Sequence, residues 1–230
     1  MARKALNVSL QLLDTDKKIS KEIRDILAKK FNIAVRKGRG PLVNELKTLV
    51  PDWLAETPVI RDLQSGGALL PEIGLPFSRG QSAADEIIHA VVESVEITVH
   101  RLDGKLRGGV TVYIQPGDFM NVMGISEATI DTGKTSLPWL DWLLTAGSKV
   151  IVRDYKIEYG SFPRRSRTGQ AIMVRSNKGP YWRMPTLYAG TVSDNFITQA
   201  FENKESHLEA LVKKHIIKRV KGYAGTVHKP

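Results

Sequence analysis

The apolar positions of the first 65 residues recur at intervals of three and four, which is the spacing of amphipathic helices. They predict a helix over residues 20–31, with Ser20 as its cap, and a second helix over residues 42–50. The intervening Gly38-Arg39-Gly40-Pro41 is expected to separate the two helices, and Pro51 to end or kink the second. Residues 1–65 are therefore expected to form a helical N-terminal region.

Glycine and proline interrupt the helical spacing in the next stretch of the chain. Residues 64–80 are rich in both, and these residue types favour turns. Residues 66–80 are therefore expected to be a linker or loop. The helical spacing returns over residues 82–91, where Ser82 is placed to cap a further helix.

The spacing of apolar residues then changes from helical to alternating. Val95, Ile97 and Val99 alternate with polar residues, and residues 110–114 repeat the pattern. Between the two runs stands Asp103-Gly104, a dipeptide typical of tight turns. The pattern predicts an antiparallel β-hairpin with one buried face.

A short helix rich in tryptophan is predicted over residues 138–147, because Pro138 suits a first helical turn and Gly147 suits the position after the last. Its apolar residues lie almost all round, so it is expected to be buried or to lie in an interface. Extended runs follow over residues 150–159 and 171–174, and a turn at residues 177–179 is expected to lead into Tyr181-Trp182.

The last apolar stripe predicts one long helix over residues 192–221, roughly 45 Å long at the standard rise per residue. Thr191 and Asp194 stand three apart, as in a capping box with Asp in place of Glu or Gln. Gly222 is expected to cap the other end. Such a helix can cross a small domain and contact a neighbouring subunit.

These elements together predict an α+β fold. It would have a helical N-terminal part, an antiparallel sheet with one or more hairpins, a short Trp-rich helix and a long C-terminal helix packed on the sheet. The expected division is a helical region at residues 1–65, a linker or loop at 66–80 and an α+β domain at 81–230. With 42% hydrophobic residues among 230, the chain has enough apolar material for a substantial core.

Charge adds a candidate partner, because 34 basic residues against 24 acidic ones give a formal net charge of +10. Such a surplus favours nucleic acid, an anionic surface or acidic partner subunits, and a solvated basic surface is an equally good interpretation. The chain has no cysteine, which excludes disulfides and cysteine nucleophiles and fits a reducing cytoplasm or particles assembled there. Neither a secretory signal nor an apolar run of membrane-spanning length is found, so a soluble protein that is not exported by this route is expected.

Sequence motifs for catalysis are few. Residues 131–136 resemble the end of a phosphate-binding loop, but Ala128 stands where the full pattern needs glycine, so a polar turn is the preferred interpretation. The five histidines are dispersed, and no Gly-x-Ser-x-Gly nucleophile elbow occurs. A hydrolase built from residues distant in sequence has no positive support, and we expect no enzymatic activity, no metal and no cofactor.

The best candidates for anion binding are Arg164, Arg165 and Arg167, three guanidiniums in four positions of a loop. A loop kept soluble by its charge is an equally good interpretation. Because no aromatic stacking motif accompanies the arginines, we expect contact independent of nucleic-acid sequence. Two further basic clusters, at residues 36–39 and 213–221, are interpreted first as helix ends, where cations suit the negative pole of the helix dipole. Contact with DNA or a partner is the less favoured alternative for both.

From Leu137 onward, the order of sequence signals resembles the neck or tail-completion proteins of tailed bacteriophages. The resemblance says little about the N-terminal helical region. It rests on Leu137-Pro138-Trp139-Leu140-Asp141-Trp142-Leu143-Leu144, Asp154-Tyr155-Lys156-Ile157, Ser166-Arg167-Thr168-Gly169-Gln170-Ala171-Ile172-Met173-Val174, Trp182-Arg183-Met184-Pro185, Tyr188-Ala189-Gly190-Thr191 and Asp194-Asn195-Phe196-Ile197-Thr198.

The resemblance implies a virion structural protein without enzymatic activity, at the junction of head and tail. Proteins of this kind form rings around the channel through which DNA passes. The implied partners are further copies of this chain, other connector, portal-side or tail proteins, and double-stranded DNA that passes without being read for sequence. No membrane partner is implied, and the expected location is the virion, assembled in the host cytoplasm.

Two sets of site residues follow from these interpretations. Arg164, Arg165 and Arg167 are the candidate contacts with DNA or another anion. Candidate packing or interface anchors are aromatic, because aromatic residues are enriched in interface cores; they are Trp139, Trp142, Trp182 and Phe201. The alternative function is that of a cytoplasmic protein that binds nucleic acid independently of sequence, which the charge alone supports.

Overall fold

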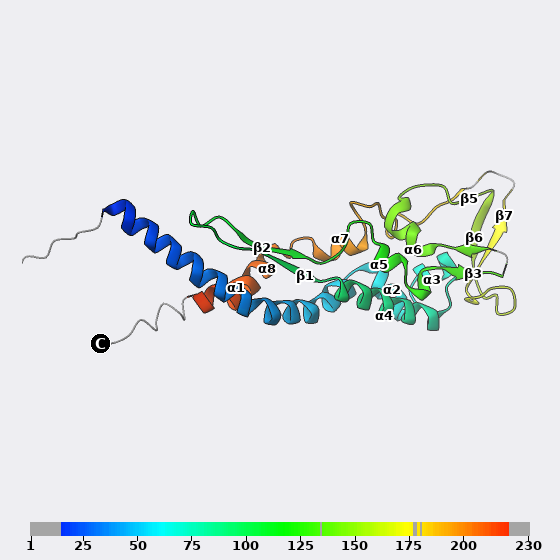
Figure 1. The fold of residues 1–230 in the computed structure, drawn as a ribbon. Coiled ribbons are helices and arrows are strands. Elements are labelled where there is room, and N and C mark those ends of the chain that lie inside the picture. The colour runs from blue at the N-terminus through cyan, green and yellow to red at the C-terminus, as the bar shows by residue number, and fades with distance from the viewer. Residues whose placement is uncertain (1–14, 134, 177–178, 180, 221–230) are drawn as a thin grey trace, which may run out of the picture.

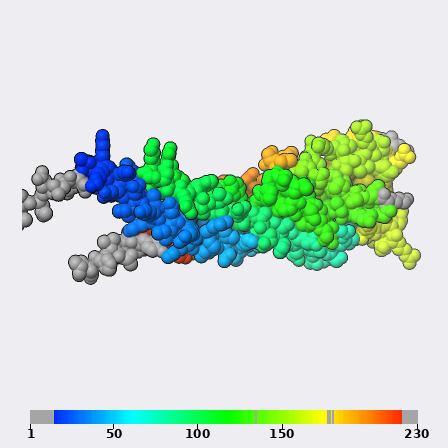
Figure 2. Space-filling view, in the orientation of Figure 1, coloured from blue at the N-terminus to red at the C-terminus, as the bar shows by residue number. Residues whose placement is uncertain are grey.

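The structure, a computed structural model, describes residues 15–133, 135–176, 179 and 181–220. It is an α+β fold with an elongated outline, in which α1 runs along much of the length (Figure 1). The short strands β3 and β5 to β7 gather at the end of the molecule opposite the start of α1 (Figure 1). The same elongated outline is seen in the space-filling view of Figure 2.

Helices account for most of the regular structure in the described part of the chain, and none of them is long and apolar enough to cross a membrane. The α-helices are α1 (Asp16–Ala55), α2 (Pro58–Ser65), α3 (Leu69–Ile73), α4 (Phe77–Glu93), α5 (Met120–Met123), α6 (Trp139–Asp141), α7 (Phe196–Phe201) and α8 (Glu205–Val212). A 3-10 helix, η1 (Ser126–Ala128), and two π-helical turns, η2 (Trp142–Ala146) and η3 (Lys213–Ile217), complete the set.

The strands pair into two-stranded antiparallel sheets: β1 with β2, β3 with β4, β5 with β8 and β6 with β7. Their bounds are β1 (Glu96–His100), β2 (Gly109–Tyr113), β3 (Ile130–Asp131), β4 (Ser136–Leu137), β5 (Val152–Arg153), β6 (Tyr155–Tyr159), β7 (Ala171–Arg175) and β8 (Tyr181–Trp182).

The helix α1 replaces the two helices expected in the N-terminal region, so the expected break at Gly38-Arg39-Gly40-Pro41 is wrong. Pro41 and Pro51 both lie inside the helix. The buried stripe of Leu42, Leu46 and Val50 continues that of Val35 without a change of face. Burial of these residues stabilises the helix by more than the roughly 3 kcal/mol that an internal proline costs.

The segment expected as a linker or loop, residues 66–80, contains α3 and the first turn of α4. Gly66 and Gly74 adopt left-handed conformations that end α2 and α3, which is a common use of glycine at helix C-termini. The linker prediction is wrong because these glycines cap short helices, whereas they were expected to lie in an irregular loop. The apolar residues between them are buried, namely Leu69, Leu70, Ile73 and Leu75.

The predicted hairpin is confirmed as β1 and β2, with Ile97 opposite Val112 on the apolar face. Asp103 closes the turn by accepting hydrogen bonds from the backbone N–H of Arg107 at 2.9 Å and from its guanidinium at 2.8 Å. These bonds from Arg107 lower the pKa of the Asp103 carboxyl to about 2.

Two local predictions near the middle of the chain are also confirmed. Thr132, Gly133 and Thr135 lie in a polar turn between β3 and β4, in which the Gly133 N–H donates to the Asp131 carboxylate at 2.7 Å. Lys134 lies outside the described residues. The Trp-rich helix is present as α6 followed by η2, and it ends at Gly147 with a φ of +56°. The extended run expected over residues 150–159 is divided between β5 and β6 by Asp154, whose φ is +60°.

The expected long C-terminal helix packed on a sheet is wrong. Residues 192–220 contain the separate helices α7 and α8, the second of which continues into η3. The helical conformation is interrupted between α7 and α8 at Asn203, whose φ is +60°. The helix cap is Asn195, which accepts from the backbone N–H groups of Ile197 and Thr198, in place of the expected Thr191. The expected C-terminal cap, Gly222, lies outside the described residues. The turn η3 packs against α1, and a Cβ at Gly38 would lie 2.5 Å from the His215 carbonyl oxygen.

One hydrophobic core extends from Val35 of α1 to Ile216 of η3 and includes buried residues on both sides of residues 66–80. By contrast, residues 16–27 of α1 contain no buried residue. This first part of α1 extends beyond the rest of the described chain in Figure 1.

Candidate functional site

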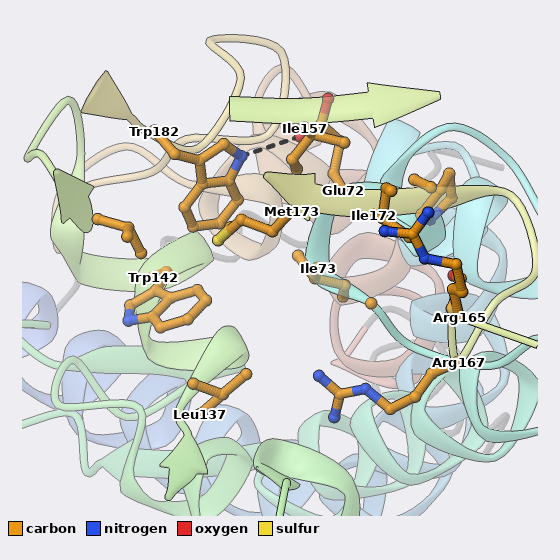
Figure 3. A pocket seen from close by; sticks show the side chains of 15 residues that line it. Glu72, Ile73, Leu137, Trp142, Ile157, Arg165, Arg167, Ile172, Met173 and Trp182 are labelled. Carbon is orange, nitrogen blue, oxygen red and sulfur yellow. Dashed lines mark hydrogen bonds between the residues drawn. The ribbon is translucent and has the colours of Figure 1, made fainter. Parts of the chain in front are cut away.

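A pocket of about 300 Å³ lies between α3, the Trp-rich helix and the β6–β7 hairpin (Figure 3). Its apolar wall includes Trp142, Met173 and Trp182. Its polar side chains belong to two segments: Glu72 lies in α3, and Arg165 and Arg167 lie in the loop between β6 and β7. The pocket thus joins segments about 100 residues apart, for example Glu72 and Trp182 at a separation of 110 positions.

Glu72 is the carboxyl group of this pocket. Its Oε2 accepts a hydrogen bond from the indole N–H of Trp182 at 3.1 Å, and its Oε1 accepts one from the Tyr159 hydroxyl. Burial raises the pKa of Glu72 above its ordinary value, and the bond from Trp182 opposes that effect in part. Glu72 was not predicted as a site residue, because its helix α3 lies in the segment expected to be a linker. The apolar Leu69-Leu70 and Ile73 around it were the signal for a short buried helix.

The three predicted tryptophans of the C-terminal half occupy different environments. Trp142 and Trp182 meet edge to face in the pocket, with ring centroids 5.6 Å apart and an interplanar angle of 70°. Trp139 is fully buried and donates its indole N–H to the carbonyl oxygen of Glu127 at 2.7 Å. All three therefore pack within the subunit, and only Trp142 is half-exposed.

The arginine loop lies at the rim of the pocket. Arg165 and Arg167 line it, across from Trp142 in Figure 3, whereas Arg164 is exposed and does not belong to the lining. The loop is closed by a hydrogen bond from the Phe162 N–H to the Gly169 carbonyl at 2.7 Å. Two of the three predicted anion contacts are thus held together beside an apolar wall.

Phe201, the fourth predicted anchor, does not belong to this pocket. It packs edge to face on Trp53 of α1, with centroids 6.1 Å apart and an interplanar angle of 77°. Lys204 places its ammonium 5.8 Å from the centroid of the same indole, within reach of a cation–π attraction. Trp53 was not singled out from the sequence, although it continues the buried stripe of Leu46 and Val50 at helical spacing.

A partly buried hydrogen bond ties the C-terminal segment to α2. The Tyr188 hydroxyl donates to Oδ2 of Asp62 at 2.5 Å, and the Leu69 N–H donates to the same oxygen at 3.1 Å. Burial, together with the bond to Asp62, raises the pKa of Tyr188. These bonds help to hold the segment after β8 against α2 and the start of α3.

The arrangement is suited to binding. An apolar wall, one hydrogen-bonded carboxyl and two cations at the rim fit a ligand or chain segment that has both apolar and anionic parts. Among the described residues, no group of three or more His, Asp or Glu side chains is placed to hold a metal ion. The Glu72 carboxyl is hydrogen-bonded to Trp182 and Tyr159, and Arg165 and Arg167 lie at the rim.

Glu72→Gln is expected to change how stability depends on pH. Because the folded protein raises the pKa of Glu72 above 4.5, its contribution to stability is full below that pH. The contribution is lost as pH rises through the folded-state pKa, since the ionised form is disfavoured by burial. Glutamine keeps an oxygen for the Trp182 N–H but cannot ionise, so the variant should lack this loss.

Urea unfolding of both proteins between about pH 4 and about pH 7 tests the point. The free energy of unfolding of the wild type, relative to Glu72→Gln, should decrease across this range. Glu202→Gln removes one exposed carboxyl and serves as the control. Parallel pH profiles for wild type and Glu72→Gln would contradict the expected role of burial.

Comparison of the chain with protein-family models, with curated proteins and with solved structures finds no match.

Proposed function

We propose that the protein is a non-enzymatic structural component of a tailed-bacteriophage virion. In this proposal it lies at the head–tail junction, as a neck or tail-completion protein, and assembles as a ring of identical subunits around the DNA channel. The sequence resemblance from Leu137 onward supports the location. The observation that supports assembly is an apolar face of a helix that is exposed to solvent in the isolated subunit.

That face belongs to the first part of α1, which contributes no residue to the core. Ile23, Ile26 and Leu27 are 53%, 54% and 43% exposed, and their spacing of three and four places them on one side of the helix. Completing the burial of such side chains would stabilise an assembly by about 25 cal/mol per Å² of apolar surface. The occupant we propose is a second copy of this chain, because a contact repeated head to tail closes into a ring.

The two ends of the molecule would then have different roles. The first part of α1 contacts the neighbouring copy, and the Trp142–Trp182 pocket at the other end receives a segment of a connector, portal-side or tail protein. The elongated outline supports this separation, since α3, β6 and β7, which contribute to the pocket, lie at the opposite end from the start of α1 in Figure 1.

The combined change Ile23→Gln, Ile26→Gln and Leu27→Gln should prevent assembly while leaving the subunit folded. Glutamine favours helix, and exposed substitutions change the free energy of unfolding by about 0.5 kcal/mol or less each. Sedimentation velocity of the full chain should show the wild type as an oligomer and the variant as a monomer. Particles made with the variant should lack an intact neck in electron micrographs.

The matched control replaces three exposed apolar residues at other places in the chain, Tyr181→Gln, Leu187→Gln and Val192→Gln. The control should still assemble into the wild-type oligomer. An unchanged oligomer in the α1 variant would refute the proposed subunit contact, and purified particles without this protein would refute the virion location.

The second candidate function, sequence-independent binding of nucleic acid in the cytoplasm, is favoured by a groove between α1 and the end of β1. Its cations are Lys29, Arg36, Arg39 and Arg101. The location of the protein distinguishes the two functions. A protein found free in infected cells and absent from particles would favour the second.

A further inference from the structure

A basic groove of about 500 Å³ lies where α1 meets the end of β1. Its cations are Lys29, Arg36 and Arg39 from α1 and Arg101 from the segment after β1. No carboxylate belongs to its lining. Residues about 60 to 70 positions apart in the sequence therefore combine into one positive surface.

Asn32 joins the two walls of this groove. Its Nδ2 donates to the Leu102 carbonyl oxygen at 3.2 Å, and the Leu102 N–H donates to its Oδ1 at 2.9 Å. This two-way bond fixes the chain beside Arg101 against α1, at the level of Lys29 and Arg36. The backbone positions that carry the cations are therefore brought together by the fold before any ligand arrives, which lowers the entropic cost of binding.

The four cations differ from other basic residues nearby because their charge is not neutralised within the described chain. Lys47 pairs with Glu93 at 3.0 Å, and Lys214 pairs with Glu45 at 2.7 Å. The described structure contains no corresponding ion pair for Lys29, Arg36, Arg39 or Arg101. At the turn of the hairpin, Asp103 is already occupied by Arg107.

Helix-end electrostatics do not explain the basic residues of α1. The preferred interpretation from the sequence was that cations at residues 36–39 offset the dipole at a helix C-terminus. The helix in fact continues to Ala55, far beyond Arg39, and the dipole effect acts only within the last turn. The dipole therefore gives no reason for the cations at Lys29, Arg36 and Arg39.

The spacing of the row fits a rigid polyanion. Lys29 and Arg39 are ten residues apart, about 15 Å along the helix axis, and Arg36 lies two turns from Lys29 on the same side. Duplex DNA carries one negative charge per about 1.7 Å of its axis, so a duplex laid along the row would present several phosphates to it at once. Three of the four cations are arginines, whose planar fork matches phosphate oxygens.

We propose that this groove binds the sugar–phosphate backbone of double-stranded DNA without reading its sequence. This binding rests on the proposed function in one respect only, namely that the DNA lies in the channel of the ring. It assigns the main DNA contact to α1 and the hairpin, and leaves Arg165 and Arg167 to the pocket. The groove is concave and its apolar lining consists of Ile33 and Val99, which is little for the anchor of a protein partner.

Salt-dependent binding of the purified full chain to a duplex of random sequence tests this assignment. The groove variant combines Lys29→Gln, Arg36→Gln, Arg39→Gln and Arg101→Gln. Each phosphate contact contributes about 0.9 to the slope of log K against log salt, so the slope of the variant should be smaller by about 3 to 4. Between about 50 and 200 mM salt, those contacts account for a change in affinity of about 100-fold.

Two controls match the groove variant. Lys149→Gln, Arg153→Gln, Arg175→Gln and Arg183→Gln remove four exposed cations elsewhere and change the net charge equally. The second control changes Arg164, Arg165 and Arg167 to Gln. Both controls should keep most of the wild-type slope, and circular dichroism should show that all variants have the wild-type helix content.

A conservative variant, Arg36→Lys with Arg39→Lys and Arg101→Lys, keeps the charge and should keep the slope. Equal loss in the groove variant and the distant control would overturn the assignment, as would no binding of wild type at about 50 mM salt. Equal affinity for polyglutamate of the same charge would overturn DNA as the ligand. These readouts use free DNA, so they are independent of whether the protein is found in particles, which tests the proposed function separately.

Discussion

Replacing Trp139 with alanine is expected to lower the free energy of unfolding by about 3–5 kcal/mol. The indole is fully buried in the core, so its removal leaves a cavity that the surrounding side chains fill only in part. The change also leaves the Glu127 carbonyl oxygen without the N–H that now lies 2.7 Å away. Urea unfolding followed by circular dichroism measures the loss.

Two further variants separate the causes of this loss. Trp139→Phe keeps most of the ring but removes the N–H donor, so it should cost less than alanine, about 1–3 kcal/mol. Tyr181→Ala removes an aromatic ring that is exposed and should change stability by about 0.5 kcal/mol or less. A loss below about 1 kcal/mol in Trp139→Ala would show that the core around α6 tolerates the cavity.

Gly38→Ala is expected to destabilise the protein by about 1–3 kcal/mol, although alanine is the better helix former. The added methyl group would lie 2.5 Å from the His215 carbonyl oxygen and 3.3 Å from Cγ1 of Ile216. The nearest obstacle is backbone, which cannot move aside as a flexible side chain can. Relief of the clash therefore requires η3 to shift away from α1.

Gly40→Ala provides the matched control, because it makes the same change in the same helix two positions away. No atom lies within 4 Å of a Cβ at Gly40, so the variant should gain up to about 1 kcal/mol from helix propensity. Hydrogen exchange gives a local readout, since amides of α8 and η3 should lose protection in Gly38→Ala but not in Gly40→Ala. Equal stability of the two variants would refute the close helix contact.

The N-terminal region shows why the helix boundaries could not be read from the sequence. A glycine needed for close approach and a glycine that ends a helix have the same local signature. Gly38 serves the first purpose, through contact with His215 in a distant segment, whereas Gly66 and Gly74 serve the second. Only the packing partner distinguishes them.

The prediction of one long C-terminal helix was wrong for a related reason. Apolar residues on both sides of Asn203 keep helical spacing, so the stripe predicts one helix. The break at Asn203 separates α7, where Phe201 packs on Trp53, from α8 and η3, which continue to the contact with α1. The spacing of apolar residues shows which face of a helix is buried. It does not show where the helix must end so that its two parts can pack on other elements.

The candidate site was predicted in part. Trp142, Trp182, Arg165 and Arg167 were singled out from the sequence, and all four line one pocket. Glu72 was missed, since nothing local connects it with Trp182. The basic groove was seen only as a cluster at residues 36–39, because Arg101 reaches it through the β1–β2 hairpin.

By itself, the sequence determined the features that depend on near neighbours. Alternating apolar residues and Asp103-Gly104 specify the hairpin, Pro138 and Gly147 bracket the Trp-rich helix, and the residues described between β3 and β4 lie in a polar turn. Tertiary structure alone decided that α1 continues through Gly38 and that Glu72 meets Trp182. It also decided that Lys29, Arg36, Arg39 and Arg101 share one groove. The physical reason is that turns, caps and periodicity depend on residues a few positions apart, whereas close helix contacts and charge clusters depend on segments that meet only when the core forms.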